Sequence, residues 1–136
     1  MSNEYRKFLS VKDLVVEYTA EEAVIQAVNS LSFDLEHGKT FGIVGETGAG
    51  KTTTAKAIMR ILPDPPAIIR NGEIFLEGQN LLKMSESEMR KVRGGKVSMI
   101  FQDPMTALNP IMKVGKQIAE VIKLHENIST REASDR

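Results

Sequence analysis

The sequence predicts an α/β fold, and three observations support that prediction. Residues 40–44 form a short apolar run bounded by glycines, which is typical of a buried strand. Residues 45–52 are rich in glycine, and residues 52–62 carry apolar side chains at helical spacing. Residues 8–18 and 24–35 are rich in β-branched and apolar residues. We therefore expect an antiparallel β region followed by a core in which a strand, a loop and a helix come in that order.

The glycine-rich stretch has the spacing of a phosphate-binding loop, or P-loop. It reads GETGAGKT and fits the pattern G-x-x-x-x-G-K followed by Ser or Thr, in which backbone N–H groups at a helix N-terminus hold a nucleotide triphosphate. We expect Lys51 to bind the β- and γ-phosphates and the Thr52 hydroxyl to coordinate Mg²⁺. An accidental glycine-rich turn is the alternative, and the flanking strand and helix disfavour it. The residues predicted to bind nucleotide here are Gly45, Glu46, Thr47, Gly48, Ala49, Gly50, Lys51, Thr52 and Thr53.

The composition argues against several classes of protein. Lys plus Arg and Asp plus Glu both number 18, so the net charge is zero and no nucleic acid is expected as the main partner. The sequence contains no cysteine, which excludes disulfides and thiolate metal sites within it. The N-terminus lacks the apolar segment of a secretory signal, and no apolar run approaches membrane-spanning length. We therefore expect a soluble, cytoplasmic protein.

Turn residues and periodicity place the other elements of the first two-thirds of the chain. Residues 8–18 and 24–35 are predicted to pair as antiparallel strands, and a turn around His37 leads out of the second one. Three prolines at positions 63, 65 and 66 end the helix that follows the P-loop. Residues 72–78, between two glycines, form a further strand. Ser85 and Glu88 make a capping box for a short helix that ends near Arg93.

A strand is predicted at residues 97–101, and it ends at Gln102. Open α/β sheets bind ligands at the carboxyl ends of their strands, so Gln102 is expected to face the phosphate site. The alternative is a loop glutamine in a turn. Asp103 precedes Pro104 and is expected to be a turn residue rather than a metal ligand.

Two helices are predicted after this loop. The first is amphipathic, with its apolar face at Val114, Ile118, Val121 and Ile122, and His125 near its end is expected to be a packing or solvated residue. Ser129 and Glu132 form a second capping box. The sequence stops at Arg136, about two helical turns later, so we expect the polypeptide to be cut short.

Three stretches together resemble one family. The P-loop, the segment GEIFLEG at 72–78 and the run SMIFQDPMTALNP at 98–110 are similar to the ATP-binding subunits of ABC transporters. Within the last run, DPMTALNP resembles the branch that imports dipeptides, oligopeptides or nickel. The resemblance extends from about residue 8 to the end and implies an ABC-type P-loop NTPase domain, of which residues 1–136 would be the N-terminal part. Residues 8–101 would form the antiparallel β region and P-loop core, and residues 102–136 the glutamine loop and the start of a helical subdomain.

The resemblance also implies roles for single residues. Tyr18 matches the aromatic residue that stacks on adenine, while an ordinary core position at the end of a strand is the alternative. Lys51 and Gln102 match residues that take part in catalysis, and Thr52 and Gln102 match those that reach the metal. ATP and Mg²⁺ are the implied cofactors.

The implied partners are a second ATP-binding subunit, transmembrane permease subunits and, indirectly, an extracytoplasmic solute-binding protein. The chain would lie on the cytoplasmic face of the cell membrane, with residues 80–95 and those after 110 toward the permease. The family's LSGGQ signature, its strand with a Mg²⁺-associated Asp and a catalytic Glu, and its switch His have no counterpart before Arg136. This implies nucleotide binding without efficient hydrolysis, and an uncovered strand edge that makes the chain prone to aggregate.

Two other functions stay open. A different P-loop enzyme, such as a small-molecule kinase, would usually begin with the P-loop strand, whereas about forty residues with β character precede it here. A phosphoryl acceptor that stimulates turnover would indicate such an enzyme. The other is a non-enzymatic module, a naturally short chain that binds nucleotide or supplies half a site to a full-length partner.

Overall fold

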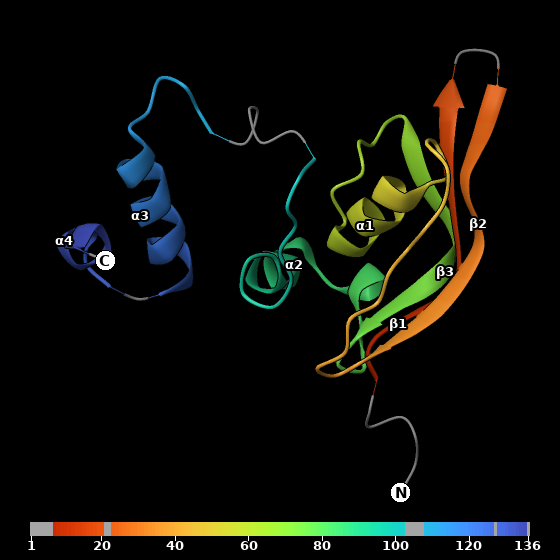
Figure 1. Ribbon diagram of the computed structural model, residues 1–136, viewed down its shortest axis with the longest axis horizontal. Coiled ribbons are helices and arrows are strands. Elements are labelled where there is room, and N and C mark those ends of the chain that lie inside the picture. The colour runs from red at the N-terminus through yellow and green to blue at the C-terminus, as the bar shows by residue number, and fades with distance from the viewer. Residues whose placement is uncertain (1–6, 21–22, 103–107, 127, 136) are drawn as a thin grey trace, which may run out of the picture. The chain divides into compact units, whose positions relative to one another are not determined.

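The computed structural model describes residues 7–20, 23–102, 108–126 and 128–135 (Figure 1). The chain forms two compact units, Met1–Glu86 and Ser87–Arg136. The first contains the sheet and the P-loop helix, and the second contains most of three short helices. The subdivision predicted from the sequence at residues 101 and 102 stays a prediction.

The first unit is built on a four-stranded antiparallel sheet. Its strands are β1 (Lys7–Ala20), β2 (Ala23–Glu36), β3 (Ala67–Leu76) and β4 (Gln79–Asn80), in the order β2-β1-β3-β4. The antiparallel pairing predicted from the alternation of the first two segments is therefore confirmed. The buried apolar side chains of this unit come from the sheet, from α1 (Lys51–Met59) and from the turn at Leu81, and are Val11, Leu14, Val16, Val28, Ala57, Met59, Ala67, Ile74, Leu76 and Leu81.

β-Bulges interrupt the pairing of the two long strands. The register shifts between Val11 and Leu14, where β1 has one extra residue, and again between Leu14 and Val16, where β2 has one extra residue. Asp13 and Ser30, which lie within these shifts, have φ values of 46° and 48°. The Ser32 hydroxyl accepts a hydrogen bond from the Asp13 N–H at 2.8 Å and so supports the first bulge.

A carboxylate near the start of the sheet gives a measurable pH effect. Asp34 accepts hydrogen bonds from Lys7 and Ser10, both at 2.6 Å, and these lower the pKa of Asp34 below its ordinary value, the Lys7 contact having the larger effect. A lowered folded-state pKa stabilises the fold above the unfolded-state value of about 3.9, and the gain is lost as the pH falls through the folded-state pKa.

We expect Asp34→Asn to lower the free energy of unfolding by about 0.5 kcal/mol at neutral pH, because both partners of this ion pair are partly exposed. The difference from the wild-type chain should shrink to nothing as urea unfolding is repeated at pH values from about 5 downward, below both pKa values. Glu36→Gln, a change of the same charge on the same strand, is the control. If the loss of free energy of unfolding in Asp34→Asn stayed constant with pH, it could not be assigned to the charged form of the Asp34 carboxylate.

The P-loop helix α1 ends earlier than predicted. It stops at Met59 and not near residue 62, because Arg60 adopts a left-handed conformation with φ 50° and its N–H bonds back to Ala57 O at 3.0 Å. The Arg60 guanidinium then donates to the carbonyls of Leu81 at 3.1 Å and Met84 at 2.6 Å. The end of α1 is thereby fixed to the 3₁₀ turn η2 (Leu81–Lys83).

Two strands predicted from apolar runs are wrong. Residues 40–44 form no strand, and Val44 is 96% exposed, although the Phe41 ring stacks on Phe33 at 4.8 Å. Residues 97–101 make only an isolated bridge between Arg93 and Val97, and Ile100 is 97% exposed. A strand needs a neighbour to pair its backbone groups, and neither run has a ladder partner among the described residues.

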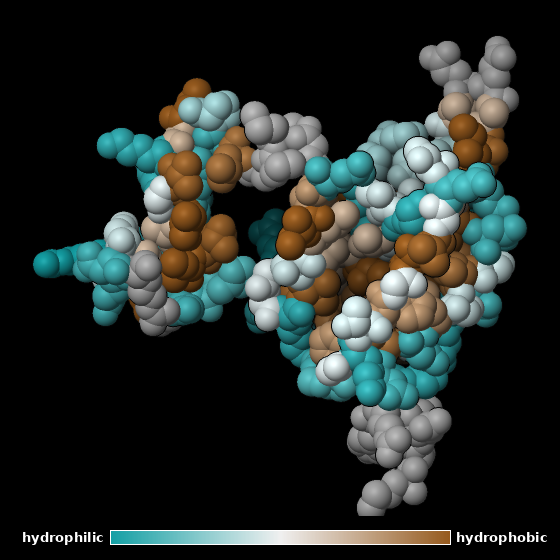
Figure 2. All heavy atoms as spheres, viewed as in Figure 1, coloured by the Kyte–Doolittle hydropathy of each residue, from teal (hydrophilic) through white to brown (hydrophobic). Residues whose placement is uncertain are grey.

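The second unit holds α2 (Glu86–Val92, whose first residue precedes the boundary), α3 (Val114–His125) and α4 (Thr130–Asp135). The capping box before α4 is confirmed, since the Ser129 N–H and hydroxyl both donate to the Glu132 carboxylate and the Glu132 N–H returns to the Ser129 hydroxyl at 3.3 Å. The predicted amphipathic helix is present as α3, and its exposed apolar residues form a band that is visible in Figure 2. Within the described ranges, no helix has the length and apolar character needed to cross a membrane.

Candidate phosphate-binding site

The P-loop leads directly into α1. Gly50 is the N-cap residue, and Gly48 and Gly50 have φ values of 86° and 76°, which other residues adopt only with strain. The Ala49 N–H donates to Glu46 O at 3.1 Å and closes a tight turn. The sequence reasoning that glycines allow this backbone path is thus matched by the geometry.

Lys51 folds back over the loop that precedes it. Its Nζ donates to Gly45 O at 2.5 Å and to Glu46 O at 2.6 Å, so the ammonium group lies against the carbonyl oxygens of the loop. Two contacts from one flexible side chain hold the loop in a compact ring. The positive charge is consequently kept beside the first turn of α1.

Thr54 is a stabilising residue that the sequence reasoning missed. Its side chain is buried, and its N–H and hydroxyl both donate to Gly50 O, at 2.8 and 2.9 Å. A threonine in the first turn of a helix can bond back to the carbonyl four residues earlier, and that spacing was the available signal. Gly50, the residue that begins α1, is therefore held by two hydrogen bonds.

The N-terminus of α1 has the properties of an anion site. The first N–H groups of a helix have no partner within it, and here no side chain caps them and no acidic residue lies in the first turn. Thr52 is exposed beside them, while Lys51 and Thr53 are half-buried. Free N–H groups, the positive end of the helix dipole and the Lys51 ammonium together favour a phosphate group.

A β-bulge in β2 lies against the P-loop at Gly50. Val16 pairs with Val28 and Glu17 pairs with Gln26, so Ala27 is the extra residue between them. A Cβ added to Gly50 would lie 2.1 Å from Ala27 O and 3.3 Å from the Val28 side chain. The backbone of Gly50 therefore contacts the bulge directly, and only glycine fits there.

Tyr18 lies at the same end of the sheet. It pairs with Ile25 on β2 and with Ala67 on β3, two residues along β1 from Val16, and its side chain is half-buried. Val16 pairs with Val28, and the side chain of Val28 lies beside Gly50 of the P-loop. Tyr18 is therefore on β1 close to the residues that border the P-loop. The predicted role of Tyr18 in stacking on a base stays a prediction.

The other candidates lie elsewhere in the chain. Gln102 is exposed and belongs to the second unit, and its predicted role at the phosphate site stays a prediction. Asp103 lies outside the described residues. His37 is in a turn, and its ring and that of Phe8 form a T-shaped pair with 5.2 Å between the ring centroids. Among the described residues, no group of three or more His, Cys, Asp or Glu side chains could hold a metal ion.

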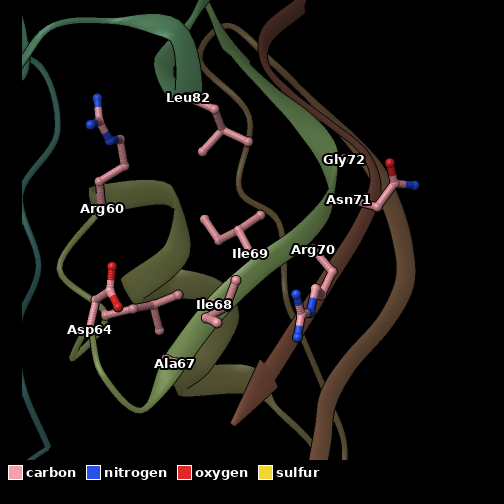
Figure 3. A pocket seen from close by; sticks show the side chains of 10 residues that line it. Arg60, Asp64, Ala67, Ile68, Ile69, Arg70, Asn71, Gly72 and Leu82 are labelled. Carbon is pink, nitrogen blue, oxygen red and sulfur yellow. The ribbon is translucent and has the colours of Figure 1, made fainter. Parts of the chain in front are cut away.

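A separate hollow of about 600 Å³ lies beside the end of α1 (Figure 3). Its lining includes the apolar side chains of Leu62 from the segment after α1, Ile69 of β3 and Leu82 of η2, together with Arg60. None of its lining residues belongs to the P-loop. This hollow is therefore not part of the candidate phosphate site.

Comparisons with known proteins agree with this geometry. The family model described as ABC transporter matches residues 28–136. The chain is 49% identical over 130 residues to the oligopeptide transport ATP-binding protein OppD of Bacillus subtilis, covering 96% of this chain and 36% of that protein. It is 46% identical to the dipeptide transport ATP-binding protein DppD of the same organism, over 93% of this chain and 38% of that protein. It is also 47% identical to OppD of Escherichia coli, over 92% of this chain and 36% of that protein.

The fold has a counterpart among solved structures. The dimeric structure of MJ0796, a bacterial ABC transporter cassette, matches with a TM-score of 0.78 at 19% identity, over 93% of this chain and 53% of that one. A second structure of MJ0796, bound to ADP and Pi, matches with a TM-score of 0.75. At this identity the likeness shows the fold alone.

The site and the fold thus define a P-loop ATP-binding cassette. The chain belongs to the ABC transporter family, and the resemblance seen in its sequence is confirmed. It spans little more than a third of the length of the curated peptide-transport relatives that it matches.

Proposed function

We propose that this chain is the nucleotide-binding part of the ATP-binding subunit of an importer of oligopeptides, dipeptides or related solutes such as nickel. The observation that carries the proposal is the uncapped N-terminus of α1, with two left-handed glycines and the Lys51 ammonium held beside it. Helix N-terminal N–H groups beside a lysine ammonium are the groups that hold phosphate oxygens in a P-loop. The residues present therefore fit a nucleotide triphosphate.

The proposed roles of the residues rest on the P-loop pattern and on the family resemblance. Backbone N–H groups of the P-loop and of the first turn of α1 would hold the phosphate oxygens of a bound nucleotide, and the Lys51 ammonium, which now contacts two loop carbonyls, would bind the β- and γ-phosphates. The Thr52 hydroxyl would coordinate a bound Mg²⁺, which would supply positive charge against the phosphates. By the family resemblance, Tyr18 would stack on adenine, and Gln102 would reach the metal and the attacking water.

Peptide import is favoured by the relatives, which are named as oligopeptide and dipeptide transport ATP-binding proteins. The proposed partners are a second ATP-binding subunit, permease subunits and, through them, an extracytoplasmic solute-binding protein. The dimeric state of MJ0796 supports the first of these. The proposed location is the cytoplasmic face of the membrane. For residues 1–136 themselves we propose binding of Mg-ATP without efficient hydrolysis.

The proposal is tested by removing the Lys51 ammonium. We expect Lys51→Ala to raise the Kd for a fluorescent ATP analogue with Mg²⁺ at least about tenfold, since a lost charge-assisted contact costs about 1.5–3 kcal/mol. Lys56→Ala removes the same charge from the same helix away from the loop and should change the Kd less than about threefold. An unchanged Kd for Lys51→Ala, or an equal loss in both variants, would overturn the proposal.

A further inference from the structure

A short helix joins the candidate phosphate site to Arg60. The nine residues of α1 span about 13 Å along the helix axis. Lys51, the first residue of the helix, lies at the phosphate site, and Arg60, its C-cap residue, lies at the opposite end. A hydrogen-bonded helix is a rigid element, so a displacement of its first turn also displaces its C-terminal end.

The Arg60 side chain connects that C-terminal end to η2. It extends from the end of α1 toward η2, which carries Leu82 (Figure 3). One nitrogen of the guanidinium, Nη1, donates to Leu81 O at 3.1 Å and to Met84 O at 2.6 Å. Both acceptors are backbone carbonyls, so the contact holds the path of the chain at η2 rather than a single side chain.

A helix cap alone does not explain an arginine at position 60. The residue has φ 50° and ψ 46°, a left-handed conformation that glycine adopts without the strain caused by a Cβ. Its N–H bonds back to carbonyls of Ala57 and Lys56, and a glycine would make the same contacts. What the arginine adds is its guanidinium, which bonds to the carbonyls at η2.

The other end of α1 has contacts that a bound nucleotide would change. Lys51 Nζ donates to the carbonyls of Gly45 and Glu46. A phosphate group that bound this ammonium would release both carbonyls, and its oxygens would bind N–H groups of the first turn. The first turn of α1 would therefore be held by different partners with and without a nucleotide.

η2 leads directly into the next helix. The Asn80 side chain accepts a hydrogen bond from the Leu82 N–H at 3.0 Å, and Leu81 is fully buried, so the turn has a defined position. It ends at Lys83, and α2 begins at Glu86. A displacement of the carbonyls that Arg60 binds therefore acts on the backbone just before α2.

We propose that Arg60 couples the phosphate site to η2, so that a nucleotide triphosphate bound at the N-terminus of α1 restrains η2 and the backbone that leads into α2. Arg60 is a positioning residue here, because it acts through α1 from the end opposite the phosphates. Coupling between two sites is reciprocal, so the contact between Arg60 and η2 also strengthens nucleotide binding. This inference rests on the proposed function and adds a response to it.

The test measures amide hydrogen exchange at Leu82 and Met84 by NMR, with and without a saturating nonhydrolysable ATP analogue and Mg²⁺. In the wild-type chain the analogue should slow exchange at both amides at least about fivefold. Arg60→Gly keeps the left-handed cap but lacks the guanidinium, so exchange should no longer respond. The Kd of this variant for the analogue should rise by about the same factor, which still allows saturation.

Lys83→Ala is the matched control. It removes a cation from η2 itself, where Lys83 forms an exposed ion pair with Glu73 at 3.8 Å, and leaves the contacts of Arg60 in place. This variant should keep the wild-type response. Urea unfolding followed by circular dichroism verifies that both variants are folded at the temperature of the exchange measurement.

The outcomes separate this inference from the proposed function. A wild-type chain that binds the analogue without slower exchange at Leu82 and Met84 would refute the coupling and leave the phosphate site intact. An undiminished response in Arg60→Gly, or a lost response in Lys83→Ala, would refute it as well. A wild-type chain that does not bind the analogue would refute both the coupling and the proposed function.

Discussion

Gly50→Ala is expected to lower the free energy of unfolding by about 3 kcal/mol or more and to raise the Kd for Mg-ATP at least about tenfold. The new Cβ would lie 2.1 Å from Ala27 O, a backbone atom that can move only with the strand. Relieving such a contact costs about 1–3 kcal/mol, and the left-handed conformation at φ 76° adds about 1–2 kcal/mol for a residue with a Cβ. The loop would be pushed away from β2, and its N–H groups would no longer converge on one point.

Gly48→Ala is the matched control. Gly48 has a similar φ of 86°, but a Cβ there would meet no atom within 4 Å. It should therefore cost only the conformational term of about 1–2 kcal/mol. Urea unfolding followed by circular dichroism, with titration of a fluorescent ATP analogue, measures both effects. Equal losses of stability in the two variants would show that the bulge at Ala27 does not position the loop.

The sequence predicted most of the first unit because its signals are local. Alternation in the two N-terminal segments specified β1 and β2, and glycine spacing specified where the loop meets α1. The early end of α1 was not predicted, because residues other than glycine rarely adopt the left-handed conformation that Arg60 has here. What makes it tolerable is a long-range contact of its guanidinium with η2.

Relations between distant segments were beyond the reach of a single sequence. The bulge at Ala27 exists only as a mismatch between two strands, and no residue of unusual type marks it. The apolar runs at 40–44 and 97–101 have the composition of strands, but composition does not supply a neighbour to pair with. The same reason explains why the P-loop motif was found and its support from β2 was missed.

The second large effect is expected in the core of the sheet. Leu14 is fully buried on β1 between two bulges, where it pairs with Leu31, and Gly72 of β3 approaches its Cα so closely that a Cβ there would lie 2.7 Å away. Backbone held this tightly on both sides has little freedom to collapse into a cavity. We therefore expect Leu14→Ala to cost about 3–5 kcal/mol, toward the upper end of the usual range for such a truncation.

Leu124→Ala removes the same atoms from a side chain that is 75% exposed and should cost less than about 0.5 kcal/mol. Unfolding in urea compares the two variants. Leu14 belongs to the core of the sheet, whereas Gly50 belongs to the loop, so we expect only Gly50→Ala to weaken nucleotide binding. The Leu14→Ala chain is therefore titrated with nucleotide at a temperature where it remains folded. Its Kd for Mg-ATP should stay within about threefold of the wild-type value. A larger rise in this Kd would mean that the path of β2 at Ala27 depends on the packing of Leu14, and that the core itself sets the shape of the phosphate site.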